Sequence, residues 1–205
     1  MKILILTWRD LAHEAAGGAE VYTEQVAANW VRWGVDVTIF AAAVAGRPDE
    51  ELVDGYRVVR AGGRFTVYRA ARQWWRREGR FEGFDLVIDM VNTVPFTAHR
   101  WVTDVPTVAF VHQTCEDIWK YNAPWGTATL GRRVLEPRWL RAYRDIPTLA
   151  VSASTRDALR DFGVQDVTVV PEGIEPASLV ELPAKEERPT IVWCARHAPY
   201  KRPMD

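Results

Sequence analysis

The sequence predicts an α/β fold built on a doubly wound, mostly parallel sheet. Short apolar runs alternate along the chain with longer segments in which apolar residues recur at helical spacing. The short runs are apolar throughout, which is typical of strands that helices cover on both faces. Strand–helix–strand repetition favours right-handed crossovers within one sheet. Hydrophobic residues make up 48% of the chain, enough for a buried core, so a disordered chain is excluded.

The expected strands cover residues 3–6, 35–43, 58–59, 86–88, 105–111, 148–151 and 167–170. Between them, helices are expected over residues 19–33, 66–79, 131–143 and 154–162. In the first helix, the apolar residues at helical spacing should face the core; these are Val21, Val26, Ala27, Trp30 and Val31.

The last expected helix has start and stop signals. Ser154 is a suitable N-cap, and Asp157 follows three residues later, as in a capping box. Gly163 stands directly after the helix, where a left-handed residue commonly ends it. The helix over 131–143 contains Pro137, which predicts a bend or a start there.

The chain divides into three parts by composition. Residues 1–170 form one domain with the strand–helix alternation. Residues 171–189 hold four prolines and five glutamates without periodicity, which indicates a linker. Residues 190–194 are one more strand-like run, so residues 190–205 are expected to start a second domain.

Charge and cysteine content exclude several classes of protein. The net charge of −1 argues against a nucleic-acid-binding protein. Cys115 and Cys194 are too few for a disulfide framework and form no metal motif, so we expect no metal and no cofactor. No run has the roughly 18 apolar residues of a membrane span, and the start lacks a signal peptide. A cytoplasmic protein is the expectation.

Paired glycines open the first helix. Gly17 and Gly18 follow the loop after the first strand, and free N–H groups and the helix dipole favour a phosphate or a sugar there. A tight turn that needs positive φ is the structural alternative. The spacing matches neither a dinucleotide fingerprint nor a P-loop, which argues against a nicotinamide-dependent oxidoreductase or epimerase.

His112 directly follows the strand that ends at Val111. Ligands of open α/β sheets bind beyond the carboxyl ends of the strands, so His112 is a candidate site residue. A loop histidine satisfied by the backbone is the alternative. Asp89 and Asn92 end a neighbouring strand and share the argument more weakly.

Residues 57–80 hold eight arginines and one acid, interleaved with aromatic residues. On a helix, Arg69, Arg72, Arg76 and Arg80 recur at steps of three and four residues and form one basic face. Such a face suits a phosphate-bearing acceptor or an anionic membrane surface. A solvated face of arginines over core aromatics is the alternative.

Arg196 and Lys201 lie just beyond the strand-like run 190–194. Two cations on a loop at a strand end can grip a diphosphate, the arginine by its fork and the lysine as a point charge.

Taken in order, these motifs resemble glycosyltransferase family 4, retaining enzymes of the GT-B fold. The similarity extends over the whole chain: Gly-Gly-Ala-Glu at 17–20, the strand ending in His112, Val-Ser-Ala-Ser at 151–154, Pro-Glu-Gly-Ile at 171–174, and Arg196 five residues before Lys201. In that family two Rossmann-like domains face each other, the first holding the acceptor and the second the nucleotide-sugar. The resemblance implies that this chain is the N-terminal, acceptor-side half.

The resemblance also implies roles for individual residues. The Gly18 backbone would approach the donor, His112 would hydrogen-bond the transferred sugar, and Arg196 with Lys201 would neutralise the diphosphate. The expected activity is transfer of a hexosyl-type group from a nucleotide-sugar to a lipid-linked, saccharide or small-molecule acceptor, with retention of configuration.

The chain departs from the family pattern in three places. Glu172 stands where the family has asparagine, Ala195 replaces the glycine before Arg196, and Arg202 replaces the glycine after Lys201. The family's paired-glutamate motif would lie beyond Asp205, so we expect these 205 residues to be inactive alone. The alternative is a non-catalytic module of the same fold that holds a partner or the inner face of the membrane through the basic face of residues 57–80.

Overall fold

The computed structural model describes residues 1–173, 181, 184 and 188–190 of the chain. The strands are β1 (Lys2–Leu6), β2 (Asp36–Ala41), β3 (Glu50–Val53), β4 (Tyr56–Arg60), β5 (Leu86–Val91), β6 (Thr107–Val111), β7 (Thr148–Ala150) and β8 (Val167–Val169). The α-helices are α1 (Gly18–Arg32), α2 (Val67–Arg77), α3 (Trp119–Asn122), α4 (Trp125–Leu130), α5 (Glu136–Arg141) and α6 (Ala153–Asp161). Short turns are η1 (Gly79–Phe81), η2 (Ala98–Arg100) and η3 (Glu116–Ile118), and η4 (Gly131–Leu135) is a π-helix.

The strands form one sheet in the order β3-β4-β2-β1-β5-β6-β7-β8. Every neighbouring pair is parallel except β3 and β4, which are antiparallel. The chain therefore builds outward from β1 in one direction, returns through α2, and builds outward in the other direction from β5. This is the doubly wound, mostly parallel sheet expected from the sequence.

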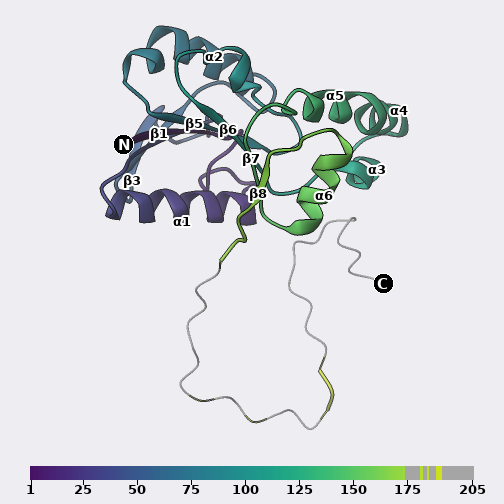
Figure 1. Cartoon of the computed structure of the whole chain (residues 1–205). Helices are drawn as coiled ribbons and strands as arrows, with labels where there is room; N and C mark the ends of the chain where they lie inside the picture. Colours follow the sequence, from purple (N-terminus) through teal and green to yellow (C-terminus); the bar gives the residue numbers. More distant parts are fainter. Residues whose placement is uncertain (174–180, 182–183, 185–187, 191–205) are drawn as a thin grey trace.

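Apolar residues on successive strand positions pack to opposite faces. Leu4 and Leu6 join the core under α2, while Ile3 and Ile5 join the core under α1. Figure 1 shows α1 and α2 on opposite sides of the sheet. A third core lies on the face of β6 and β7 that points away from α1. Leu140 of α5 and Leu159 of α6 pack into this core. A strand that is apolar at every position thus contributes to two cores at once.

The buried side of α1 differs from the expected apolar stripe. Ala27 is buried as expected, but Val21 is 41% exposed. The buried positions include Glu20, Thr23 and Glu24 instead. Glu20 and Glu24 find partners on other elements, and the Thr23 hydroxyl donates to the Ala19 carbonyl within the helix. Their burial could therefore not be inferred from hydrophobic spacing.

Two helix starts also differ from expectation. The N-cap of α6 is Ser152, whose Oγ accepts a hydrogen bond from the Thr155 N–H at 3.1 Å, so Ser154 lies inside the helix. Gly163 follows α6 with φ +91°, as expected for a glycine that ends a helix. The helix expected over 131–143 begins earlier, at Trp125, and continues through η4 into α5.

The remaining sequence expectations have mixed outcomes. The antiparallel edge strand β3 was not expected, because Glu50 and Glu51 interrupt its apolar pattern. Most of the predicted linker, from residue 174 on, and the predicted strand over 191–194 lie outside the described residues.

Candidate active site

The candidate site lies at the carboxyl ends of β1, β5 and β6. The chain leaves β1 toward β2 on one side and later leaves β5 toward β6 on the other. The order therefore reverses between β1 and β5, where an open α/β sheet forms a crevice for ligands. The loop after β1 leads into the N-terminus of α1, and His112 follows β6.

Gly17 and Gly18 open α1 without needing the conformational freedom of glycine. Gly17 is extended, with φ −150° and ψ −159°, and neither glycine has a left-handed φ. A Cβ built on Gly18 would meet no atom within 4 Å. The tight-turn explanation therefore fails, and the open space in front of Gly18 is left as the distinguishing feature.

Glu20 completes the cap of α1. Its carboxylate accepts a hydrogen bond from the Gly17 N–H at 2.7 Å, and its side chain is 2% exposed. Arg9 pairs with the same carboxylate at 2.8 Å, and the Asn92 amide donates to it at 3.4 Å. The end of β5 is thereby tied to the start of α1. Sequence reasoning did not single out Glu20, although its place three residues after Gly17 is the capping-box spacing.

His112 is held from two sides. Its Nδ1 lies 2.5 Å from a carboxylate oxygen of Glu172, and its ring packs edge-on against Tyr22 of α1 with centroids 5.8 Å apart. The ring is 9% exposed, yet its buried Nε2 has no hydrogen-bond partner among the described residues. A carboxylate at Nδ1 favours the tautomer with the proton on that nitrogen, which leaves a lone pair on Nε2.

The contact with Tyr22 places His112 against the first turns of α1, the helix that begins at Gly18. Burial, with a further contribution from the nearby charge of Glu172, raises the pKa of the Tyr22 hydroxyl. Tyr22 is therefore a neutral hydrogen-bonding group at neutral pH.

Known proteins share this arrangement of elements. Residues 16–178 match the sequence profile of Glycosyltransferase Family 4. The chain belongs to this family. A sucrose-phosphate synthase from Thermosynechococcus elongatus superposes with a TM-score of 0.62 at 17% identity, over 83% of this chain and 47% of that one. A structure from E. coli titled "Trehalose-6-phosphate … bound with UDP-2-fluoro glucose" gives 0.50 at 12% identity, over 85% and 49%. No curated protein sequence gave a match.

The family 4 domain has the fold of the N-terminal half of a GT-B glycosyltransferase, and it spans about half the length of these two structures. The resemblance in the sequence motifs is thus confirmed at the level of family and fold.

Asp89, the weaker candidate on β5, has a structural role in the family 4 domain. It is fully buried and accepts hydrogen bonds from the N–H groups of Phe96 and Ala98 at 3.1 and 2.9 Å. The Tyr143 hydroxyl also donates to it, at 2.5 Å. Burial raises the pKa of this carboxyl, while these hydrogen bonds counteract the rise. Asp89 therefore organises the loop after β5 from below the crevice.

The predicted basic face lies elsewhere. Arg69, Arg72 and Arg76 are exposed on α2, and Arg80 follows in η1 with its guanidinium 4.8 Å from the ring centre of Phe81. None of them is brought to the crevice by any contact among the described residues. Arg196 and Lys201 lie outside the described residues.

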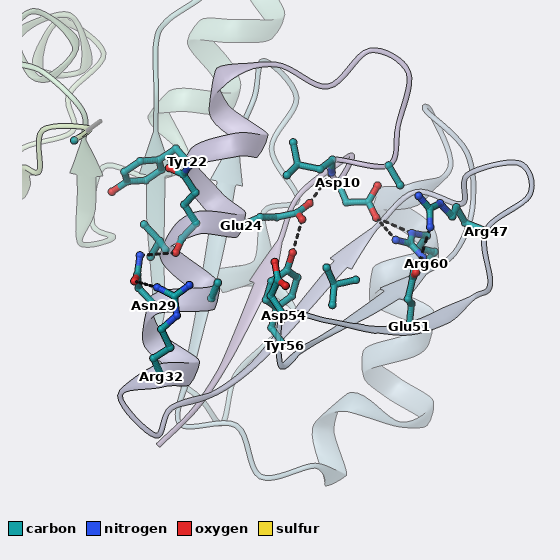
Figure 2. A pocket seen from close by; sticks show the side chains of 17 residues that line it. Asp10, Tyr22, Glu24, Asn29, Arg32, Arg47, Glu51, Asp54, Tyr56 and Arg60 are labelled. Carbon is teal, nitrogen blue, oxygen red and sulfur yellow. Dashed lines mark hydrogen bonds and ion pairs between the residues drawn. The ribbon is translucent and has the colours of Figure 1, made fainter. Parts of the chain in front are cut away.

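A depression with a volume of about 850 Å³ runs along α1 and the β3–β4 hairpin (Figure 2). Several of its charged side chains pair with one another. Arg60 contacts Asp10 at 2.6 Å and Glu51 at 2.7 Å, and the Tyr56 hydroxyl donates to Glu24. Since a ligand would have to separate these pairs, we interpret the depression as a set of polar contacts that hold the fold together rather than as a preformed binding site.

Within residues 1–173 and the few described beyond them, no three histidine, cysteine, aspartate or glutamate side chains could together hold a metal ion. No helix in the described part of the chain is long and apolar enough to cross a membrane.

Proposed function

We propose that this domain is the acceptor-side half of a retaining, hexosyl-type glycosyltransferase that uses a nucleotide-sugar donor. The observation that carries the proposal is the buried Nε2 of His112, which has no hydrogen-bond partner among the described residues and lies near the N-terminal turns of α1. A buried nitrogen without a partner is costly in a resting fold and is explained when a ligand supplies the missing hydrogen bond.

The N-terminus of α1 would receive the negatively charged part of the donor. The first hydrogen bond of the helix runs from the Val21 N–H to the Gly17 carbonyl at 3.1 Å. The N–H groups of Gly18 and Ala19 therefore have no partner within the helix. Together with the helix dipole, they favour a phosphate oxygen or a developing negative charge in the open space before Gly18.

His112 would hold the transferred sugar. When Nδ1–H of His112 donates a hydrogen bond to Glu172, the lone pair on Nε2 can accept a hydrogen bond from a sugar hydroxyl. Glu172 occupies the place of the family's asparagine, and its carboxylate lies at Nδ1 of His112 in this chain. Glu172 is therefore a positioning residue in this proposal, and His112 is the catalytic residue.

The remaining parts of the proposed reaction lie outside the described residues. Arg196 and Lys201 would neutralise the diphosphate as the glycosidic bond breaks. The E. coli structure's title names a UDP-sugar as its ligand, which supports a nucleotide-sugar donor here. Because the chain spans about half of its structural neighbours, we propose that transfer requires a further nucleotide-sugar-binding domain and that these 205 residues alone are inactive.

The test is a transfer assay on the full-length gene product, read by mass spectrometry, with nucleotide-sugars and candidate acceptors. We expect His112→Ala to lower kcat/KM about 100-fold, as for loss of one polar group that contacts the transition state. Glu172→Gln should lower it less, because the amide oxygen can still accept from Nδ1. Both variants should keep the wild-type melting temperature within a few degrees. A His112→Ala enzyme with wild-type turnover would remove His112 from the site.

Peripheral binding to the cytoplasmic face of a membrane is a second proposed property, favoured by the outer surface of α2. Arg69, Arg72, Arg76 and Arg77 are exposed there, and no ion pair to an acidic side chain is formed by any of them within the described domain. Exposed aromatic rings stand at both ends of the helix, Phe65 at 83% and Phe81 at 72%. Clustered arginines beside exposed rings suit an anionic headgroup layer.

Co-sedimentation with phosphatidylglycerol vesicles tests this property. Binding should fall steeply as salt rises and should disappear when the four arginines are changed to glutamine, with vesicles of phosphatidylcholine as the control. Absence of sedimentation at low salt would exclude the membrane contact and leave the transferase proposal intact.

A further inference from the structure

A separate aromatic pocket borders the crevice on the side of the β4–α2 loop. It has a volume of about 230 Å³. Four aromatic side chains line it, two from loops, Trp8 and Phe65, and two from helices, Tyr68 of α2 and Trp119 of α3. Asn92, which donates to Glu20 in the cap of α1, also lines it. The pocket and the proposed donor site therefore share a wall.

The polar groups of this pocket are few. Arg64 stands at the pocket with its guanidinium 5.4 Å from the ring centre of Phe65 and 5.9 Å from that of Trp8. No acidic partner of Arg64 occurs within the described residues. The Thr93 hydroxyl is already hydrogen-bonded to the Cys115 sulfur at 2.7 Å. Arg64 and Asn92 are therefore the side chains most available to a ligand.

Cys115 contributes an apolar wall rather than a reactive group. Burial raises the pKa of its thiol to about 11, so the thiol is protonated at neutral pH. Val94, Ile118 and Ala123 complete the apolar lining.

The size and chemistry of the pocket restrict its ligand. Sites for drug-sized ligands occupy about 300–1,000 Å³, so this pocket admits a single substituted ring. A free hexose carries several hydroxyl groups, and among the lining side chains mainly Arg64 and Asn92 are available to bind them. An aromatic ring packs well among aromatic side chains, and an anionic substituent would neutralise Arg64.

We infer that this pocket is the acceptor subsite and that it takes a single-ring aromatic acceptor with one hydroxyl group and one anionic substituent, a phenolic acid. The anionic group contacts Arg64, and the hydroxyl points past Asn92 toward the crevice where the donor sugar is held. The role of this ligand as the acceptor rests on the proposed function, whereas its chemical class is argued from the pocket itself.

The test measures binding without a donor, by isothermal titration of the full-length gene product with 4-hydroxybenzoate. The neutral 4-hydroxybenzyl alcohol and glucose are the comparison ligands. We expect Arg64→Gln to weaken 4-hydroxybenzoate about tenfold and to change the neutral alcohol little. Phe65→Ala should weaken both about fivefold.

Matched control variants are Arg141→Gln and Trp33→Ala, since both residues are exposed, lie outside the pocket and belong to neither proposed binding surface. They should bind 4-hydroxybenzoate like the wild type. Glucose binding more tightly than 4-hydroxybenzoate, or equal losses in the controls, would overturn the inference.

The same titrations separate the two proposals. Transfer of sugar to other acceptors without any binding of 4-hydroxybenzoate overturns the subsite and leaves the transferase standing. Binding of 4-hydroxybenzoate that depends on Arg64, with no transfer from any nucleotide-sugar, supports the phenolic-acid site and counts against the proposed reaction.

Discussion

A glycine can stand at the start of a helix because the backbone conformation requires it or because a ligand needs the space of a side chain. Replacing Gly18 distinguishes these two reasons. Its backbone is not left-handed, and a Cβ would enter open space. Alanine is favoured over glycine by about 1 kcal/mol in a helix interior and by less in the first turn. For a domain of this size, each 1 kcal/mol shifts the melting temperature by about 2–4 °C. Gly18→Ala should therefore raise the melting temperature by up to about 4 °C.

The same substitution should weaken donor binding. The new methyl group would occupy the space where a phosphate approaches the N–H groups of Gly18 and Ala19. Loss of an anion contact at a helix N-terminus costs up to about 2 kcal/mol, which is a decrease in affinity of roughly 30-fold. Gly18→Val adds two methyl groups and should reduce binding further.

The measurement pairs thermal melting with titration of a nucleoside diphosphate into the full-length gene product. Gly126→Ala is the matched control, because Gly126 also lies in a helix, has no left-handed φ and meets no atom within 4 Å of a built Cβ. A Gly18→Val protein with wild-type affinity would refute the placement of the donor at α1. A Gly18→Ala protein that unfolds would instead show that the glycine is needed by the fold.

Two further substitutions test the packing that surrounds the site. Glu136 is buried and accepts hydrogen bonds from the N–H groups of Cys115 and Glu116 and from the Trp119 indole at 2.5, 2.9 and 2.8 Å, so Glu136→Ala should lower the free energy of unfolding in urea by about 2–4 kcal/mol. Glu136→Gln should cost less, and equal losses would argue against the hydrogen bonds as the cause. Burial, followed by the charge of Arg100, lowers the pKa of His99 below its ordinary 6.5, so wild-type stability should fall as the pH drops through 6.5 toward the lowered pKa. His99→Phe should lose this part of the pH dependence, and parallel stability curves for the two proteins would contradict the assignment.

The sheet was predictable from the sequence because its strands are apolar on both faces. Ile3 and Leu4 illustrate the rule: neighbours in sequence, they belong to different cores. The strand β3 was missed because an exposed edge strand need not be apolar, and Glu50 and Glu51 instead pair with arginines on the sheet. Periodicity detects burial by hydrophobic contact and does not detect burial by ion pairing.

The prediction for the inner side of α1 was wrong for a related reason. Glu24 is buried because the Tyr56 hydroxyl and the Leu11 N–H both donate to it. Burial raises the pKa of this carboxyl, and these hydrogen bonds counteract the rise. Each partner lies on a different element, so no local pattern reveals the arrangement. Hydrophobic spacing therefore predicted Val21 on the inner side of α1, whereas its side chain is exposed.

The candidate site was predictable in part. The carboxyl ends of neighbouring parallel strands meet at one edge, which predicts Gly18 and His112 on one crevice. The structure adds that the His112 ring packs against Tyr22, one turn into α1 from Gly18. The contact between His112 and Glu172 joins residues 60 positions apart and depends on the course of the chain after β8. Sequence reasoning noted Glu172 only as a departure from the family pattern.

Glu20 explains how a negatively charged cap can coexist with the proposed anion site. A carboxylate at the first turn would repel a diphosphate that approaches the N–H groups of Gly18 and Ala19. Arg9, itself 15% exposed, neutralises Glu20 at 2.8 Å, and the Gly17 N–H takes up the remaining carboxylate oxygen. The cap thus holds the loop after β1 in place while adding little net charge to the crevice. In the proposed site, the helix dipole and the N–H groups of Gly18 and Ala19 would then set the potential that a donor phosphate meets.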